Sequence, residues 1–151
     1  MDWHTVSDCS GGFLMTRRDS IDKICKIGAI ILRDKKVLVG RDKGRNKFTI
    51  PGGRIETNET DVQCLKRELK EEYGVGLVSQ KYFGTFEDEA AFDPGMQIVM
   101  RVYITRIRSE PKAQSEVVES LYINSRDKGI RLGSIIEKFV IPELVRQNLI
   151  D

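Results

Sequence analysis

The sequence predicts a single α/β domain in which helices cover a β-sheet. The chain has 151 residues, which fits one compact domain of ordinary size. Hydrophobic residues make up 40% and charged residues 32%, a globular balance with enough apolar material for one core. β-rich runs alternate with helical patterns, and there is no internal repeat or low-complexity tract. Strands and helices interleaved in this way favour a sheet packed against helices.

The expected strands are apolar runs separated by turn residues. The runs 23–32 and 37–39 flank the polar turn 33–36 and predict a hairpin. A short strand at 48–50 is expected to end at the Pro-Gly-Gly sequence 51–53. Proline removes an amide donor there and glycine admits positive φ, so a sharp, open turn is expected. The later runs complete the set of strands: 77–87, 97–107 and 117–123.

Two helices are expected after these first strands. Apolar residues recur at helical spacing from 60 to 73, and Gly74 is expected to end that helix as its C-cap. Ser134 is expected to cap a final helix, which Pro142 should kink or divide. Between the strands, 88–95 is expected to be a loop with turn chemistry.

Charge and cysteine content limit the class of protein. The formal net charge is +2, which argues against a stable nucleic-acid partner and against a membrane-surface protein. No apolar run approaches the length of a membrane span. The polar segment 1–22 lacks the pattern of a signal peptide, so we expect a flexible N-terminal extension before one domain at 23–151. The three cysteines, Cys9, Cys25 and Cys64, form no CxxC pair and fit no simple disulfide framework, which predicts a reducing, cytoplasmic location.

The predicted helix at 60–73 carries carboxylates beside its apolar face. Glu68, Glu71 and Glu72 are three and four residues apart, so their side chains are expected to converge. Such carboxylates repel one another, and partial burial increases the cost. A hard divalent cation relieves the repulsion because Mg²⁺ prefers oxygen ligands and is commonly shared with substrate phosphates. The same cluster is also typical of a solvated helix face, so the helix alone leaves both interpretations open.

A longer pattern surrounds these carboxylates in the segment GGRIETNETDVQCLKRELKEEYGV at 52–75. Its fixed residues are Gly53, Glu59, Arg67, Glu68, Glu71, Glu72 and Gly74. The segment resembles the Nudix box, G-x5-E-x7-R-E-U-x-E-E-x-G-U with U apolar, at every specified position. Average residue frequencies would produce these fixed residues by chance on the order of once in a billion windows, so the motif is specific.

The resemblance to the Nudix hydrolase family, MutT-like, implies an α/β/α sandwich around a mixed sheet, with a catalytic loop–helix–loop. It also implies Mg²⁺-dependent hydrolysis, with Mn²⁺ as a possible substitute, of a nucleoside diphosphate linked to a group X. The favoured substrate is a nucleoside triphosphate, including an oxidised one. ADP-ribose, nucleotide sugars and dinucleoside polyphosphates are alternatives, and a non-catalytic nucleotide-binding module is an alternative of another class. The partner is expected to be a small nucleotide-like molecule, and the protein a monomer or a homodimer.

The resemblance further implies roles at the metal. Glu71 and Glu72 would be ligands, Glu68 a ligand or the base that orients the attacking water, and the Gly52 carbonyl a further ligand. Glu116 is a candidate carboxylate from outside the box, and an exposed loop charge is the alternative interpretation. A rival acidic cluster at 87–89 is more typical of a solvated loop.

Other residues of the box are expected to shape it. Arg67 would pair with Glu59, and Gly53, which is also a candidate substrate-binding residue, would allow the tight turn into the box. Basic residues before the box are candidates for contacting phosphates, although they are also ordinary surface charges. These candidates are Arg41, Arg45 and Lys47.

Overall fold

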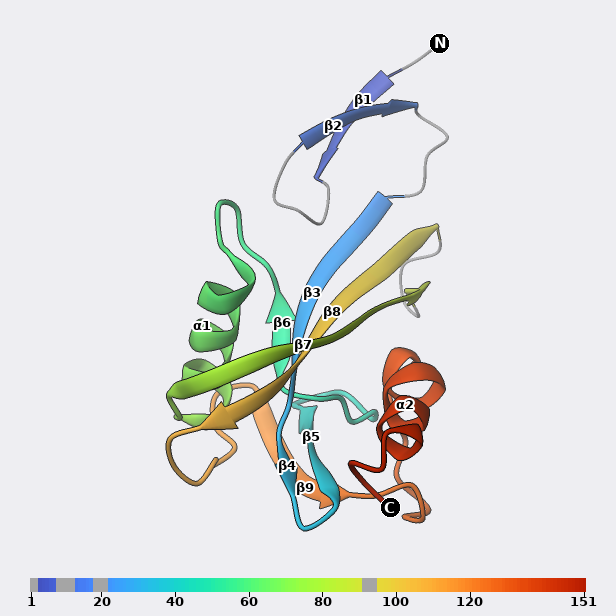
Figure 1. Ribbon diagram of the computed structural model, residues 1–151. Coiled ribbons are helices and arrows are strands. Elements are labelled where there is room, and N and C mark those ends of the chain that lie inside the picture. The colour runs from blue at the N-terminus through green and yellow to red at the C-terminus, as the bar shows by residue number, and fades with distance from the viewer. Residues whose placement is uncertain (1–2, 8–12, 18–21, 91–94) are drawn as a thin grey trace.

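The centre of the fold is a four-stranded mixed sheet in the order β6-β3-β8-β7 (Figure 1). The computed structural model describes residues 3–7, 13–17, 22–90 and 95–151. In this sheet β3 and β8 are parallel, and the outer strands pair with them in antiparallel fashion. The mixed sheet confirms the predicted fold class. Its strands are β3 (Asp22–Ile30), β6 (Gly52–Arg54), β7 (Leu77–Glu89) and β8 (Met96–Ile107).

A second, antiparallel sheet has the order β4-β5-β9. Its strands are β4 (Leu32–Arg33), β5 (Lys36–Asp42) and β9 (Val117–Ile123). β4 and β5 form the predicted hairpin, and the two residues between them, Asp34 and Lys35, both have positive φ. This is the turn geometry that matches the twist of paired strands.

The expected short strand at 48–50 was wrong. Thr49 makes only an isolated bridge with Gly40, and Phe48 one with Leu132. The pairing begins instead at β6, inside the expected open turn, where Gly53 lies opposite Ile27 of β3. The first residues of the box, Gly52–Arg54, therefore pair with the central sheet through backbone hydrogen bonds.

Helix α1 (Asp61–Tyr73) has the predicted bounds and a cap at each end. The Thr60 side chain accepts from the Gln63 amide, and the Gln63 side chain accepts from the Thr60 amide, which forms a capping box. Gly74 ends the helix in the left-handed conformation, at φ 64°. The box helix is thus held at both ends by short-range interactions.

Two hydrophobic clusters lie on opposite sides of the sheet and give three layers (Figure 1). Because side chains alternate along a strand, Ile27 and Ala29 of β3 pack in the cluster that contains Leu65 and Leu69 of α1. Ile30 belongs to the other cluster, which is closed by the C-terminal helical residues. The sheet is therefore covered by α1 on one face and by the C-terminal segment on the other.

The C-terminal helix divides as expected before Pro142. A π-helical turn, η1 (Ile136–Val140), leads into α2 (Ile141–Arg146). Proline has no amide hydrogen to donate to the preceding turn, so the regular hydrogen-bond ladder is interrupted there. Ser134 does not cap this helix, and its hydroxyl donates to Asp88 of β7 instead.

The N-terminal strands β1 (Trp3–Ser7) and β2 (Phe13–Arg17) pair in antiparallel fashion within the segment expected to be a flexible extension, whose flexibility stays a prediction. Of the loop expected at 88–95, residues 88 and 89 belong to β7, which corrects its start, and residues 91–94 lie outside the described part of the chain. Cys25 is disulfide-bonded, which corrects the expectation that the cysteines form no simple disulfide framework.

In the part of the chain that the structure describes, no helix has the length and apolar character needed to cross a membrane.

Thr60→Ala is expected to lower the free energy of unfolding by about 1 kcal/mol, because the helix loses the side-chain acceptor of its capping box. Urea unfolding followed by circular dichroism measures the loss. Thr57→Ala, in the same loop and exposed, is the matched control and should change stability little. Equal effects of the two substitutions would contradict a specific contribution of the cap.

Candidate functional site

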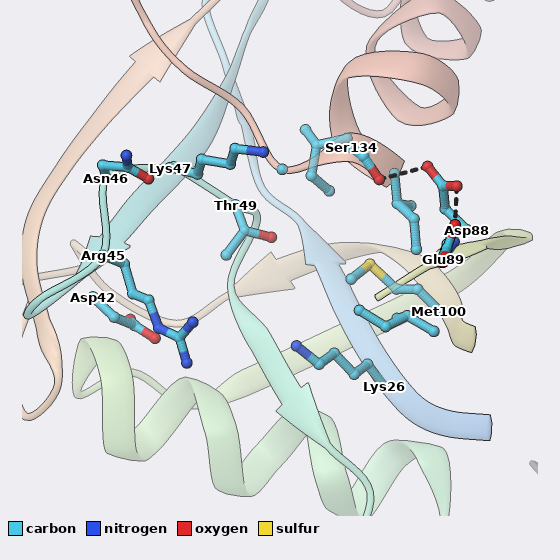
Figure 2. A pocket seen from close by; sticks show the side chains of 14 residues that line it. Lys26, Asp42, Arg45, Asn46, Lys47, Thr49, Asp88, Glu89, Met100 and Ser134 are labelled. Atoms are coloured by element: carbon cyan, nitrogen blue, oxygen red, sulfur yellow. Dashed lines mark hydrogen bonds between the residues drawn. The ribbon is translucent and has the colours of Figure 1, made fainter. Parts of the chain in front are cut away.

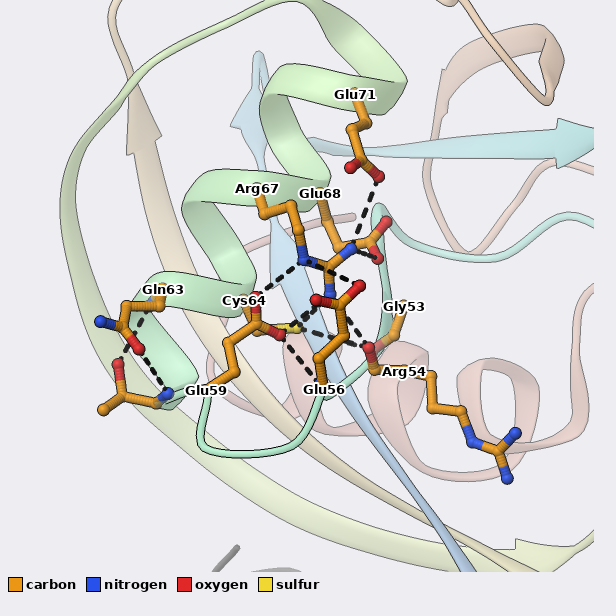
Figure 3. Close-up of polar contacts among 10 residues, drawn as sticks. Gly53, Arg54, Glu56, Glu59, Gln63, Cys64, Arg67, Glu68 and Glu71 are labelled. Atoms are coloured by element: carbon orange, nitrogen blue, oxygen red, sulfur yellow. Dashed lines mark hydrogen bonds and ion pairs between the residues drawn. The ribbon is translucent and has the colours of Figure 1, made fainter.

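Arg67 lies at the centre of a network that joins α1 to the loop before it (Figure 3). Its Nε and Nη2 atoms donate to the two carboxylate oxygens of Glu59, at 2.7 and 2.9 Å. Its Nη1 atom donates to Glu68 at 2.7 Å and to Glu71 at 3.5 Å, and Nη2 also reaches the carbonyl of Arg54. The predicted pairing of Arg67 with Glu59 is therefore present, and the same guanidinium also contacts two of the predicted ligands.

Glu59 is the most strongly held acid of this network. Its side chain is 12% exposed, and its Oε1 atom also accepts from the Glu56 amide at 3.0 Å. The hydrogen bonds from Arg67 lower the pKa of Glu59 to about 2. Bidentate, charge-assisted pairs of this kind are geometrically specific, so the loop is fixed relative to the helix.

Two glycines bring the backbone close to the acids of α1. Gly52 has φ 141°, and a Cβ atom there would lie 2.0 Å from the carbonyl oxygen of Ile27. A Cβ atom on Gly53 would lie 2.5 Å from Oε1 of Glu68. Glycine is required at 52, where a side chain would collide with the β3 backbone, whereas a side chain at 53 would displace the Glu68 carboxylate.

Glu72 faces the same turn from the next part of the helix. Its Oε1 atom accepts from the Gly52 amide at 2.9 Å. Burial raises the pKa of Glu72 above its usual range, and the negative charge of neighbouring Glu68 raises it further. Two close carboxylates in a partly dry site favour either a shared proton or a cation between them.

Glu71 is the most exposed of the three acids, at 55%, and it shares the Arg67 Nη1 donor with Glu68. Across 22–90, 95–151 and the two N-terminal strands, no three carboxylate, thiol or imidazole groups converge as a ready metal site. Glu68 is in contact with Glu72, and Glu71 approaches Glu68 through the Arg67 Nη1 atom that donates to both, so their joint role at a metal stays a prediction. The donors that do meet are oxygens, which suit a hard divalent cation.

Glu116 and Asp42 extend the acidic surface beyond the box. Glu116 is exposed, and its carbonyl accepts from the Lys43 amide at 2.7 Å. Burial raises the pKa of Asp42, and the charge of Glu116 adds to the rise. The charge of Asp42 in turn helps to raise the pKa of Glu72. Asp42 was missed by the sequence analysis, although an acid that ends an apolar strand was a visible signal.

The basic candidates separate into two groups. Arg41 does not line the cavity described below: it pairs with Glu119 at 3.2 Å and donates to the Arg45 carbonyl at 2.9 Å. Arg45 and Lys47 are exposed and line the cavity, on the loop that leads to the box (Figure 2). Arg45 and Lys47 therefore lie at the cavity and Arg41 does not, and contact of any of the three with substrate stays a prediction.

A cavity of about 260 Å³ lies between the sheet and the start of the C-terminal helical segment. One end is lined by Asp42, the basic loop and Lys26 of β3, and the apolar lining includes Met100 and Ile136 (Figure 2). Lys26 was also missed by the sequence analysis. A single lysine within the apolar run 24–31 was the signal that could have found it.

The rival acidic cluster lies at the far end of this cavity, on β7 and not in a solvated loop. Asp88 accepts from the Ser134 hydroxyl and from Lys138, at 2.5 and 2.9 Å. These bonds lower the pKa of Asp88 to about 2. Asp88 thereby ties the edge of the sheet to the C-terminal segment.

Comparisons with known proteins agree with the motif and the fold. A family model of the NUDIX domain matches residues 25–124. The chain is 41% identical over 51 residues to an RNA pyrophosphohydrolase of Halorhodospira halophila, and 38% identical over 58 residues to an 8-oxo-dGTP diphosphatase of Buchnera aphidicola. These matches cover 33% and 38% of this chain, and the chain spans only 28% and 47% of the two relatives.

The fold is similar to that of a solved structure described as a putative nudix hydrolase family member from Chromobacterium violaceum. The TM-score is 0.65 and the sequence identity is 26%. The similarity covers 83% of this chain and 78% of that one.

Because of the Glu59–Arg67 pair, we expect the free energy of unfolding to fall as the pH is lowered. A carboxylate whose pKa is lower in the folded state stabilises the fold above its unfolded pKa. That contribution is lost as the pH falls from about 4.5 towards about 2. Glu59→Gln should therefore have a lower free energy of unfolding at pH 7, and its stability should fall less steeply across this window.

Denaturant unfolding at a series of pH values measures both effects. Glu137→Gln, at an exposed position on η1, serves as the control and should follow the wild-type curve. A Glu59→Gln curve that runs parallel to that of the wild type would show that the pair contributes nothing to acid sensitivity.

Proposed function

We propose that this chain, which belongs to the Nudix hydrolase family, hydrolyses a phosphoanhydride bond of a nucleoside triphosphate in the presence of Mg²⁺. The family model covers about two thirds of the chain, from 25 to 124. The observation that carries the proposal is the pairing of Glu68 with Glu72 beside the Gly52 amide, on the same edge of the fold as a cavity with basic residues.

The choice of a triphosphate is supported by the relatives. The Buchnera aphidicola protein is described as an 8-oxo-dGTP diphosphatase, and a protein of Escherichia coli that is 30% identical over 69 residues as a CTP pyrophosphohydrolase. Both descriptions name a nucleoside triphosphate. The match to the Buchnera protein covers less than half of either chain, so the substrate is part of the proposal.

A divalent cation is the cofactor that fits the acids of α1. Glu68 and Glu72 would hold it, with the Gly52 carbonyl beside them, and Glu71 would join by a rotation of its exposed side chain. Glu116 is proposed as a further ligand through its position next to Asp42. When bound, such a cation lowers the pKa of a water molecule and offsets charge on the phosphoryl group. Mg²⁺ is proposed because every donor is an oxygen, and Mn²⁺ is the expected substitute.

The protein's own groups position the reaction. Arg67 and Glu59 keep the loop and the helix in fixed relation, so the backbone at Gly52 and Gly53 stays close to the carboxylates. Glu68, which is 13% exposed, is proposed as either a ligand or the base that orients the attacking water. A fixed arrangement of this kind reduces the reorganisation that the reaction requires.

Other substrates remain alternatives within the same chemistry: ADP-ribose or a nucleotide sugar, and a dinucleoside polyphosphate. A non-catalytic nucleotide-binding module would not need three acids on the box helix, and this chain retains Glu68, Glu71 and Glu72. We further propose a cytoplasmic monomer or homodimer without a stable nucleic-acid partner, and without a membrane partner. The low net charge of +2 supports the last two points. The disulfide at Cys25 removes the argument from cysteine content for the cytoplasmic location.

A panel of substrates tests the function directly. We expect Mg²⁺-dependent release of pyrophosphate from one or more standard or oxidised nucleoside triphosphates, with weaker turnover of ADP-ribose, nucleotide sugars and dinucleoside polyphosphates. Product analysis by ion-exchange chromatography, with and without Mg²⁺, provides the measurement. Tight binding of nucleotides without any turnover would favour the binding module and overturn the proposal.

Glu72→Gln should reduce kcat by about 100-fold or more while the fold is retained, because several kcal/mol of charge stabilisation in the transition state depend on this carboxylate. Steady-state kinetics and circular dichroism provide the two measurements. Glu116→Gln, assayed in parallel, should also reduce kcat if its carboxylate joins the metal. Glu137→Gln is the surface control. Near-normal turnover by Glu72→Gln would remove it from the proposed ligands.

A further inference from the structure

Lys26 is a cation in an unusual position, in the middle of the central sheet. It follows Ile24 and Cys25 in β3 and precedes the buried residue Ile27. Its side chain is half-buried and lines the cavity. In Figure 2 its amine end points across the cavity toward the side from which Arg45 and Asp42 come.

The position of Lys26 connects the cavity with the box. In the strand register Lys26 lies opposite Arg54 of β6, next to the turn that holds Glu72, and beside Met100 of β8. The charges that act on its ammonium include Asp42 and Glu72, both on the acidic side of the site. Lys26 is therefore placed where a ligand in the cavity approaches the carboxylates.

In the described part of the chain, the acids that act on the Lys26 ammonium, Asp42 and Glu72, do so without forming an ion pair with it. Among the described residues Lys26 makes no ion pair or side-chain hydrogen bond. Burial lowers its pKa and the charge of Arg45 lowers it further. Taking a charge out of water without a close counterion costs free energy, and a bound anion would recover part of that cost.

We propose that Lys26 binds the phosphate chain of the substrate inside the cavity and so fixes which end of the nucleotide faces the box. A lysine is suited to this role because its ammonium is a compact point charge on a flexible stem. Lys26 attracts a phosphate more strongly than exposed Arg45 and Lys47 do, because water screens a half-buried charge less. The inference rests on the proposed function for the identity of the anion.

This orientation places the nucleoside toward the apolar lining of the cavity. Ile98 and Met100 of β8 and Ile136 of η1 provide that lining. The opposite end carries Asp88, whose oxygens are already used by Ser134 and Lys138. Negative charge at that end disfavours phosphate, so the two ends of the cavity differ in the group that they accept.

The test measures binding of inorganic pyrophosphate with Mg²⁺ by isothermal titration calorimetry. We expect Lys26→Met to weaken binding by about tenfold or more, because the substitution removes the charge and retains the length of the side chain. Lys26→Arg should retain most of the affinity. Lys81→Met, an exposed strand lysine outside the cavity, is the matched control and should bind as the wild type does.

Thermal unfolding of the same variants separates binding from a structural role. Removal of an unpaired, half-buried charge should leave the Tm of Lys26→Met equal to or above that of the wild type. Affinity of Lys26→Met within twofold of the wild type would overturn the inference, as would a wild type that does not bind pyrophosphate. Failure of the proposed function is a separate result, because it appears as absence of nucleotide turnover by the wild-type protein.

Discussion

The pairing of Arg67 with Glu59 is the constraint on which the rest of the site depends. It joins a loop that has no regular structure of its own to a helix that is capped at both ends. The same guanidinium holds Glu68 against the backbone of Gly53, where a side chain would displace the carboxylate. A single charged group thereby sets the distance between the turn and the acids, and it does so before any ligand is present.

The central strand β3 serves both halves of the site. Its backbone pairs with the turn at Gly52 and Gly53, which places the acids of α1 on one side of the sheet. Its Lys26 side chain lines the cavity that lies toward the C-terminal segment. Successive side chains of a strand point to opposite faces of the sheet. Alternate residues of β3 therefore pack against α1, and the residues between them face the side on which the cavity lies. Acids for a cation and a cavity for an anion therefore meet at one edge of the domain.

Short-range features of the site were predictable from sequence, whereas long-range ones were not. The bounds of α1 follow from the apolar spacing over 60–73 and from Gly74, because these are local signals. The Arg67–Glu59 pair was expected from the resemblance to the Nudix box. The structure departs from expectation where distant segments meet. Ser134 bonds to Asp88, 46 residues away, and does not cap a helix. Lys26 and Asp42 line a cavity formed by several elements, so local patterns give only a weak indication of their roles.

The central claim is that Glu68 and Glu72 gather a divalent cation at the edge of the sheet. Titration with Mn²⁺, followed by the electron paramagnetic resonance signal of the free ion, measures this most directly because it requires neither substrate nor turnover. The account predicts saturable binding by the wild type and its loss in a Glu68→Gln, Glu72→Gln double variant that remains folded. Equal Mn²⁺ binding by the two proteins would contradict the account.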